Sequence, residues 1–113
     1  MNGDKATKVV FADEEVKKEY DNLEKFDPKL YKFISRALDD LKREPDCGIH
    51  IPKKLIPKIY VQEYGINNLW KYDLPGGWRL IYSLAGSEVE VVAIVLEWFD
   101  HKNYEKRFGY RSR

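Results

Sequence analysis

The fold of this chain is decided by residues 69–110, which read LWKYDL, PGG, WRLIYSL, AGS, EVEVVAIVLEW and FDHKNYEKRFGY in succession. Apolar and polar side chains alternate in the first two long segments, which is typical of strands with one buried face. The glycine, proline and serine of the short segments favour turns. The third long segment is almost continuously apolar, which favours a central strand covered on both faces. The stretch predicts three consecutive antiparallel strands followed by a basic, aromatic tail.

Side-chain alternation divides the first two strands into two faces. One face carries large apolar side chains that we expect to build the core: Trp70, Tyr72, Trp78, Leu80 and Tyr82. The opposite face carries Lys71 and Arg79. We expect this second face to be the working surface and to meet His101 and Tyr104 from the tail.

Two helices are predicted before these strands. Asp13, followed by two glutamates, is typical of a helix N-cap. Asp27 followed by Pro28 marks a second start. Apolar residues then recur at helical spacing over residues 30–41, and Pro45 ends the pattern.

The remaining N-terminal half is less regular. Residues 8–12, KVVFA, predict a first strand. Pro52 and Pro57 exclude a regular central strand from residues 46–68. We expect a loop there, with a short strand over residues 59–63.

This order of elements predicts an α+β domain of two layers that spans residues 1–113. An N-terminal strand and a helical hairpin pack on a three- to four-stranded antiparallel sheet. Residues 1–7 are expected to lack regular structure. Since the helices cover one face of the sheet, the other face is expected to be partly open to a ligand.

Composition limits the classes of function. The net charge is +1, but from residue 101 onward five Lys or Arg side chains accompany one acid, so the C-terminal end is basic. No apolar run approaches the ~20 residues of a membrane helix, and a single cysteine suits a reducing compartment. A cytoplasmic protein without a membrane partner is therefore expected. Two histidines and one cysteine lack metal-ligand spacing, so no metal and no cofactor are predicted.

The segment WRLIY, with the apolar strand after it and the later DHKNY, resembles the RelE/ParE toxin superfamily. This likeness covers residues 69–104, and the two preceding helices support it. The resemblance implies a toxin of a type II toxin–antitoxin system. Its ribonuclease members cleave mRNA on the ribosome, inhibit translation and are held inactive by a cognate antitoxin. The ParE branch instead poisons DNA gyrase.

Site residues follow from the resemblance one position at a time. Arg79 matches the arginine of the family's third strand, and Tyr104 matches its C-terminal tyrosine. His101 stands where the family commonly has a basic residue. These three are the expected catalytic residues. The expected RNA-binding residues are Lys53, Lys54, Lys71, Lys102, Lys106 and Arg107. The family pattern is broken at residues 98–99, where some ribonucleases carry another arginine.

Cleavage of RNA by its own 2′-hydroxyl needs a base, an acid and cations near the phosphate. A histidine such as His101 can carry either proton transfer near neutral pH. The Arg79 fork suits a phosphate, although pairing with Asp73 or Glu90 is the structural alternative. Tyr104 can stack on a base or transfer a proton, or it can be a hydrophobic anchor.

Three functional hypotheses remain open from the sequence. The first is a RelE-like endoribonuclease, an mRNA interferase. The second is a ParE-like gyrase poison. The third is a RelE-fold domain without toxicity that binds a partner. The first two imply a cognate antitoxin, and the first adds mRNA and the ribosome; a homodimer or a toxin–antitoxin hetero-oligomer is also open. The first hypothesis requires Lys71, Arg79, His101 and Tyr104 to converge on one surface.

Overall fold

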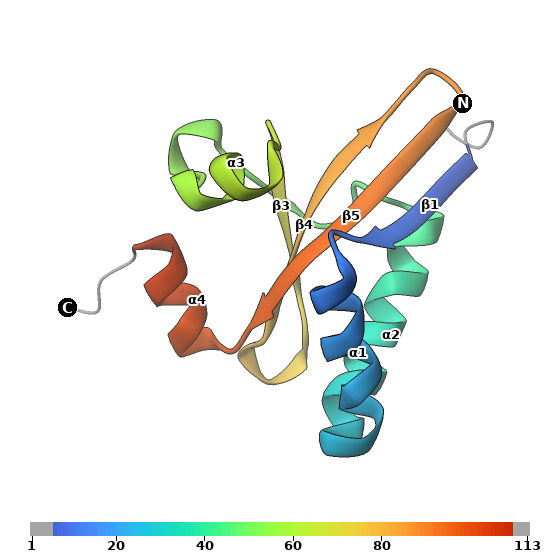
Figure 1. Cartoon of the computed structure of the whole chain (residues 1–113), viewed down its shortest axis with the longest axis vertical. Coiled ribbons are helices and arrows are strands. Elements are labelled where there is room, and N and C mark those ends of the chain that lie inside the picture. Colours follow the sequence, from blue (N-terminus) through green and yellow to red (C-terminus); the bar gives the residue numbers. More distant parts are fainter. Residues whose placement is uncertain (1–5, 110–113) are drawn as a thin grey trace.

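The computed structural model describes residues 6–109 and has one mixed sheet with helices on both faces (Figure 1). The strand order is β1-β5-β4-β3-β2; β1 is parallel to β5, and the other neighbouring pairs are antiparallel. The α+β class is confirmed, with five strands and one parallel pair in place of three or four antiparallel strands. The strands are β1 (Ala6–Phe11), β2 (Ile49–Ile51), β3 (Leu69–Asp73), β4 (Arg79–Gly86) and β5 (Glu90–Phe99).

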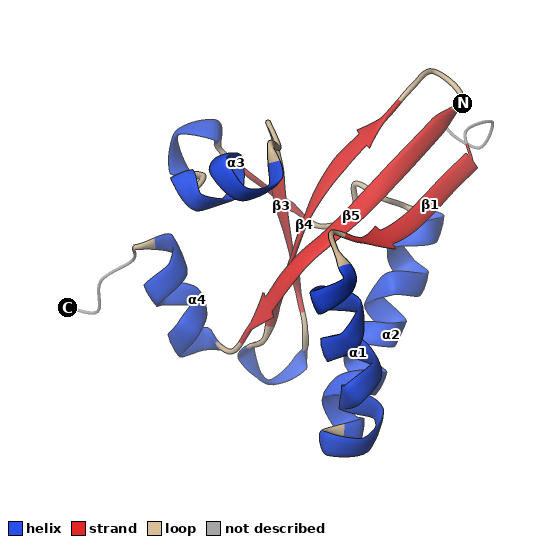
Figure 2. Cartoon of the chain, viewed as in Figure 1, coloured by secondary structure: helices blue, strands red, loops and turns tan. Residues whose placement is uncertain are grey.

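Four α-helices lie within the described part of the chain (Figure 2). They are α1 (Glu14–Phe26), α2 (Pro28–Arg43), α3 (Lys58–Tyr64) and α4 (His101–Phe108), and two 3₁₀ turns, η2 (Lys53–Leu55) and η3 (Pro75–Gly77), accompany them. Within residues 6–109, no helix combines the length and the apolar composition needed to cross a bilayer.

Both predicted helix starts are confirmed by their caps. Asp13 Oδ1 accepts a hydrogen bond from the Val16 N–H at 3.0 Å, and Asp27 Oδ1 accepts one from the Leu30 N–H at 3.2 Å. The α2 helix ends before Pro45, as its sequence predicts. Each cap satisfies a backbone donor that the helix itself leaves without a partner, which fixes where α1 and α2 begin.

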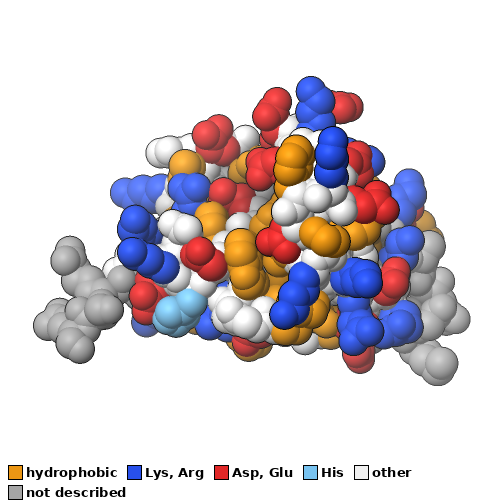
Figure 3. All heavy atoms as spheres, turned by 90° about the horizontal axis from the view of Figure 1, so that it is seen from below, with side chains coloured by type: hydrophobic (Ala, Val, Ile, Leu, Met, Phe, Trp, Pro, Cys, Tyr) orange, Lys and Arg blue, Asp and Glu red, His pale blue; other side chains and the backbone are white. Residues whose placement is uncertain are grey.

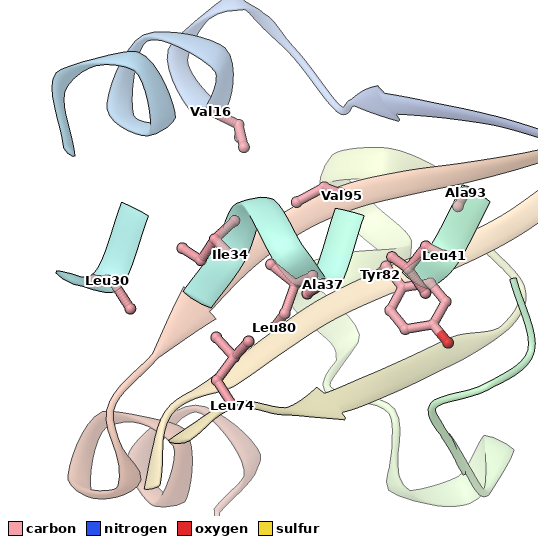
Figure 4. Close-up of a cluster of buried hydrophobic side chains, with 10 residues drawn as sticks. All are labelled: Val16, Leu30, Ile34, Ala37, Leu41, Leu74, Leu80, Tyr82, Ala93 and Val95. Atoms are coloured by element: carbon pink, nitrogen blue, oxygen red, sulfur yellow. The ribbon is translucent and has the colours of Figure 1, made fainter. Parts of the chain in front are cut away.

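The predicted apolar face of the sheet packs against α1 and α2 (Figure 4). Leu80 and Tyr82 of β4 are fully buried there, as predicted, and Trp70, Tyr72 and Trp78 pack around them. The fully or nearly fully buried members of this cluster are Val16, Leu30, Ile34, Ala37, Leu41, Leu74, Leu80, Tyr82, Ala93 and Val95. This layer is the larger of the two cores and holds β4 and β5 in place.

A close approach of the chain ties β2 to this core. The Tyr82 hydroxyl donates to the Pro45 carbonyl at 2.9 Å and accepts from the Gly48 N–H at 3.0 Å. A Cβ at Gly48 would lie 2.5 Å from that hydroxyl oxygen, so only glycine fits this position without a shift. The contact guides the chain from α2 to the sheet edge at β2.

A second apolar cluster covers the opposite face of the sheet. Its buried side chains are Ile51, Tyr60, Leu69, Ile81, Leu96 and Tyr104, and they join the sheet to α3 and α4 (Figure 1). The face of the sheet opposite α1 and α2 was expected to be partly open. It is open only where α3 and α4 do not cover it. The predicted tail is a helix over most of its length.

The predictions for the chain between α2 and β3 are wrong in two places. The expected strand over residues 59–63 is instead part of α3, and the unpredicted strand β2 pairs with β3. Pro57 is the N-cap residue of α3, a place where a proline costs no helical hydrogen bond. Of the N-terminal residues expected to lack regular structure, residues 1–5 lie outside the described part, whereas Ala6 and Thr7 belong to β1.

A bulge in β5 determines which side chains reach the second cluster. Ile81 pairs with Glu97 and Tyr82 pairs with Val95, so Leu96 is the extra residue. Leu96 packs in the second cluster, and the neighbouring Glu97 contacts Arg107 of α4. The bulge thus turns two consecutive side chains of β5 toward the same face of the sheet, which strict alternation does not allow.

Candidate functional site

A shared carboxylate joins the two cations of the predicted working face. Asp73 and Arg79 are cross-strand partners on β3 and β4. Lys71 Nζ lies 2.9 Å from Asp73 Oδ1, and Arg79 Nε lies 3.0 Å from the same oxygen. The lysine contact is a hydrogen bond, whereas the arginine contact is an ion pair whose N–H does not point at the oxygen. Two cations and one carboxylate leave one positive charge uncompensated.

The ring of Tyr104 forms the floor beneath these cations. Arg79 Cζ lies 5.4 Å from the ring centroid, and Lys71 Nζ lies 6.0 Å from it. Tyr104 is only 5% exposed and stacks on Phe108, with ring centroids 4.5 Å apart. The hydrophobic anchor considered from the sequence is therefore what the structure shows. Cation–π attraction of this kind holds a guanidinium in a fixed plane.

His101 lies beside the turn that leads into β4. A Cβ at Gly77 would lie 3.5 Å from the His101 Cβ, and Arg79 Nη1 donates to the Gly77 carbonyl at 2.6 Å. The imidazole is 61% exposed, and its Nε2 lies 3.4 Å from Glu105 Oε2. The η3 turn thus joins His101 to the Arg79 guanidinium, and the four residues predicted to converge share one corner.

An ion pair between α4 and β5 fixes the other side of α4. Arg107 Nη2 donates to Glu97 Oε1 at 3.2 Å, and both side chains are half-buried. The Arg107 guanidinium also packs over the rings of Tyr60 and Phe99 at 5.8 and 5.5 Å. Burial, with the nearby Glu97 carboxylate, raises the pKa of Tyr60 above its usual range. We assign Arg107 mainly to the attachment of α4 to β5 and α3.

The other lysines predicted to bind RNA lie on two separate elements, η2 and α4. Lys53 and Lys54 are exposed on η2, close to the end of β3 that begins at Leu69. Arg79 lies at the opposite end of β3, where it pairs with Asp73. Lys102 and Lys106 are exposed on α4. Each of these four is accessible to a ligand, but they do not form a single patch.

The surface around the site is mixed in charge. Seen from below, Lys and Arg side chains alternate with acidic ones, and hydrophobic side chains reach the surface between them (Figure 3). Within residues 6–109, no three His, Cys, Asp or Glu side chains are placed to hold a metal ion. Partial burial raises the pKa of the Cys47 thiol, and the Asp40 and Glu44 carboxylates raise it further, although the residue as a whole is exposed. A thiol with a raised pKa is a weak nucleophile near neutral pH.

Sequence reasoning missed the acidic partners of these cations on β5 and α4. Glu105 follows His101 by one helical turn, and that spacing is a signal for a contact once α4 is recognised as a helix. Glu97 faces Arg107 only because of the bulge in β5, for which the sequence has no clear sign. Asp73 was considered as a partner of Arg79, but its contact with Lys71 was not.

Comparison of the chain with protein-family models, with curated proteins and with solved structures finds no match.

Proposed function

We propose that this protein is a RelE-like endoribonuclease toxin that cleaves mRNA and thereby inhibits translation. One observation carries the proposal. Lys71 and Arg79 lie over the buried ring of Tyr104, and His101 stands at the same corner beside the η3 turn. Cations held rigidly next to an exposed imidazole are what cleavage by a 2′-hydroxyl requires.

The proposed reaction is an internal transfer within the RNA. The 2′-oxygen loses its proton and attacks the adjacent phosphorus, so that a 2′-O–P bond forms. The bond from phosphorus to the 5′-oxygen of the next nucleotide breaks, and this oxygen takes up a proton. The products are a 2′,3′-cyclic phosphate and a free 5′-hydroxyl, and no water is consumed.

Each residue of the corner has a role in this scheme. Arg79 and Lys71 stabilise the charge that develops on the phosphate oxygens, because their positions are fixed by Asp73 and the Tyr104 ring. His101 carries one of the two proton transfers, and its exposure allows it to reach the RNA. Tyr104 is a positioning residue, since its ring is buried beneath the cations.

The proposed partners are mRNA on the ribosome and a cognate antitoxin. Both rest on the resemblance to the RelE/ParE superfamily. In such systems a small neighbouring gene encodes the antitoxin, whose amphipathic segment packs on the toxin. A short acidic open reading frame directly beside this gene is the expected genomic signature.

The first prediction concerns Arg79 and the growth of cells that express the protein. Wild-type protein is expected to arrest growth and to deplete intact mRNA, and Arg79→Ala is expected to abolish both because the phosphate loses its planar partner. Arg79→Lys keeps the charge without the fork and should recover only part of the activity. Arg36→Ala, an exposed arginine on α2, is the matched control and should remain toxic. Full toxicity of Arg79→Ala would sink the proposal.

A second candidate function is a partner-binding domain without cleavage. It is favoured by the acidic neighbours of the site, because Asp73 already contacts both cations and Glu105 lies close to His101. This candidate predicts that expression leaves mRNA intact and growth normal, with or without Arg79. A ParE-like gyrase poison would instead arrest growth with DNA damage signalling and without mRNA loss.

A further inference from the structure

An open depression of about 520 Å³ lies between α4 and the ends of β4 and β5. Its lining combines aromatic, amide and cationic side chains: Trp78, Trp98, Phe99, Asn103, Lys106 and Arg107, with Asp100. The depression sits where β5 continues past its last partner on β1, the pair Phe11 and Val95. We refer to it as the Trp98 depression.

Two indole rings give the Trp98 depression flat apolar surfaces. Leu80 is the cross-strand partner of Trp98, so Trp78 and Trp98 are diagonal neighbours on one face of the sheet. Both tryptophans pack against the larger core and remain partly exposed. A tryptophan that is fixed on one side by a core and open on the other suits the stacking of a planar ligand.

Polar groups at the rim define the rest of the ligand. The side chain of Lys106 is exposed, and no hydrogen bond or ion pair joins its ammonium to another residue within residues 6–109, so its charge is available. Asn103 is exposed, and its side-chain amide can both donate and accept. Asp100 Oδ1 is engaged as the N-cap of α4, where it accepts from the Asn103 N–H at 2.9 Å. The ligand should therefore have a flat ring, a polar edge and an anionic group.

We propose that the Trp98 depression binds one unpaired base of single-stranded RNA, with the neighbouring phosphate at Lys106. Aromatic stacking joined to a backbone cation is the usual chemistry of single-strand recognition. RNA as the ligand rests on the proposed function. An acidic peptide would also satisfy Lys106, but it has no planar group for two indoles, so peptide binding is an outcome of the test.

The strand register connects this depression to the Arg79 corner. Trp78 directly precedes Arg79 in the chain, and Arg79 is the cross-strand partner of Phe99, which lines the depression. An RNA strand with its scissile phosphate at Arg79 can therefore pass around the open end of the β4–β5 pair, where Arg79 faces Phe99 beside the η3 turn. The base in the depression would then flank the cleavage position, and this base would set a preference for nucleotide context.

The test measures binding without cleavage. Full-length Arg79→Ala protein is titrated with a short single-stranded RNA, and tryptophan fluorescence is followed. Single-tryptophan variants assign the signal: a protein that keeps only Trp98, with Trp70→Phe and Trp78→Phe, should be quenched. The Trp70→Phe variant, which removes the indole that packs against His50 at the β2–β3 edge, should show the same fluorescence decrease on RNA binding as its parent.

Substitutions of exposed residues avoid damage to the core. Lys106→Ala should weaken RNA binding several-fold, and Asn103→Ala should change the base preference. Lys42→Ala, an exposed lysine on α2, is the matched control and should bind as the parent does. An RNA that lacks one base should bind about tenfold more weakly than its intact counterpart, because a stacked base is lost.

Three results would overturn the inference: loss of the fluorescence decrease in Trp70→Phe, equal affinity for intact and abasic RNA, or full competition by a short polyglutamate peptide. The test is independent of catalysis, because Arg79→Ala protein supplies the binding data. Quenching at Trp98 in a protein whose wild-type form cuts no RNA would support this site and contradict the proposed ribonuclease. Cutting without quenching would do the reverse.

Discussion

Asp73 controls how much positive charge the Arg79 corner offers to a phosphate. A single oxygen, Oδ1, lies within 3.0 Å of both Lys71 Nζ and Arg79 Nε. The carboxylate therefore orders the two cations and also competes with a phosphate for them. Since Tyr104 and the Gly77 carbonyl hold the guanidinium as well, the position of Arg79 does not depend on Asp73 alone.

The second prediction concerns Asp73→Asn, which removes this competing charge. Partly exposed ion pairs contribute about 0.2–1 kcal/mol each, and Asp73 makes two of them, so we expect RNA to bind about two- to thirtyfold more tightly to the variant. Asp39→Asn, an exposed carboxylate on α2, changes the net charge equally and serves as the control. The measurement is the dissociation constant of a non-cleavable RNA. Weaker binding by Asp73→Asn would mean that Asp73 positions the cations and does not compete with the phosphate.

The sequence predicts which site residues share a face but not how deeply they are buried. Alternation along β3 and β4 correctly places Lys71 and Arg79 on the side opposite the larger core. The burial of Tyr104 depends on α3 and α4 closing over the sheet, which is a tertiary event. A sequence pattern therefore cannot decide between a stacking tyrosine and a floor beneath the cations.

At the level of elements, α4 is the part of the fold on which the site depends most. It carries His101 and Tyr104 and begins at the Asp100 cap. The helix has only two turns, so its position relies on this cap, on the Arg107–Glu97 pair and on the Tyr104 ring. Loss of any one of these contacts should loosen the whole corner.

The third prediction compares two N-caps of the same chemistry. Asp100→Ala and Asp13→Ala each remove a carboxylate that accepts a backbone N–H, and each should cost about 0.5–2 kcal/mol of stability. Asp100→Ala should also reduce toxicity and RNA cleavage strongly, because α4 frays. Asp13 caps α1 on the other side of the sheet, so Asp13→Ala should retain activity. Chemical denaturation and growth assays on both variants provide the comparison; equal activity of the two would argue against a role for α4.

Elements that are marked by local caps and turns are predicted better from the sequence than the others. The caps of α1 and α2 and the turn at residues 75–77 are local signals, and the predictions from them are confirmed. The turn predicted at residues 85–87 is placed too early, because Ala85 and Gly86 still pair with β5 as the last residues of β4. Pro57 predicts a break in a strand, whereas in the structure it is the N-cap residue of α3. Asp100 and Gly109 bracket α4 as a cap at each end, so this helix had a usable signal that the tail interpretation overlooked.

For the whole molecule, the parallel pairing of β1 with β5 completes the sheet at one edge, and no local sequence pattern predicts this pairing. The two strands are brought together only after the helical hairpin folds back, since β1 precedes α1 and α2 and β5 follows the other strands. Because β1 ends at Phe11, the last residues of β5 remain uncovered on that side. The depression beside α4 is a consequence of this mismatch in strand length.

The fourth prediction is the salt dependence of RNA binding. The net charge of +1 and the mixed surface leave few cations for phosphates. If Lys71, Arg79 and Lys106 each neutralise one phosphate, the logarithm of the binding constant should fall with the logarithm of salt concentration with a slope of about −2. Arg79→Ala should make this slope shallower by about 0.7. A much steeper slope would require Lys53, Lys54 and Lys102 on the path of the RNA and would contradict the compact site described above.

The fifth prediction concerns the chemistry of the cut ends and tests the central claim most directly. The purified protein is incubated with ribosomes programmed with a defined mRNA, and both ends at the cut are identified. The proposed mechanism predicts a 2′,3′-cyclic phosphate on one fragment, a 5′-hydroxyl on the other, and no cut where the nucleotide before the scissile phosphate is 2′-deoxy. Intact mRNA, a 5′-phosphate end, or cleavage of the 2′-deoxy substrate would contradict it.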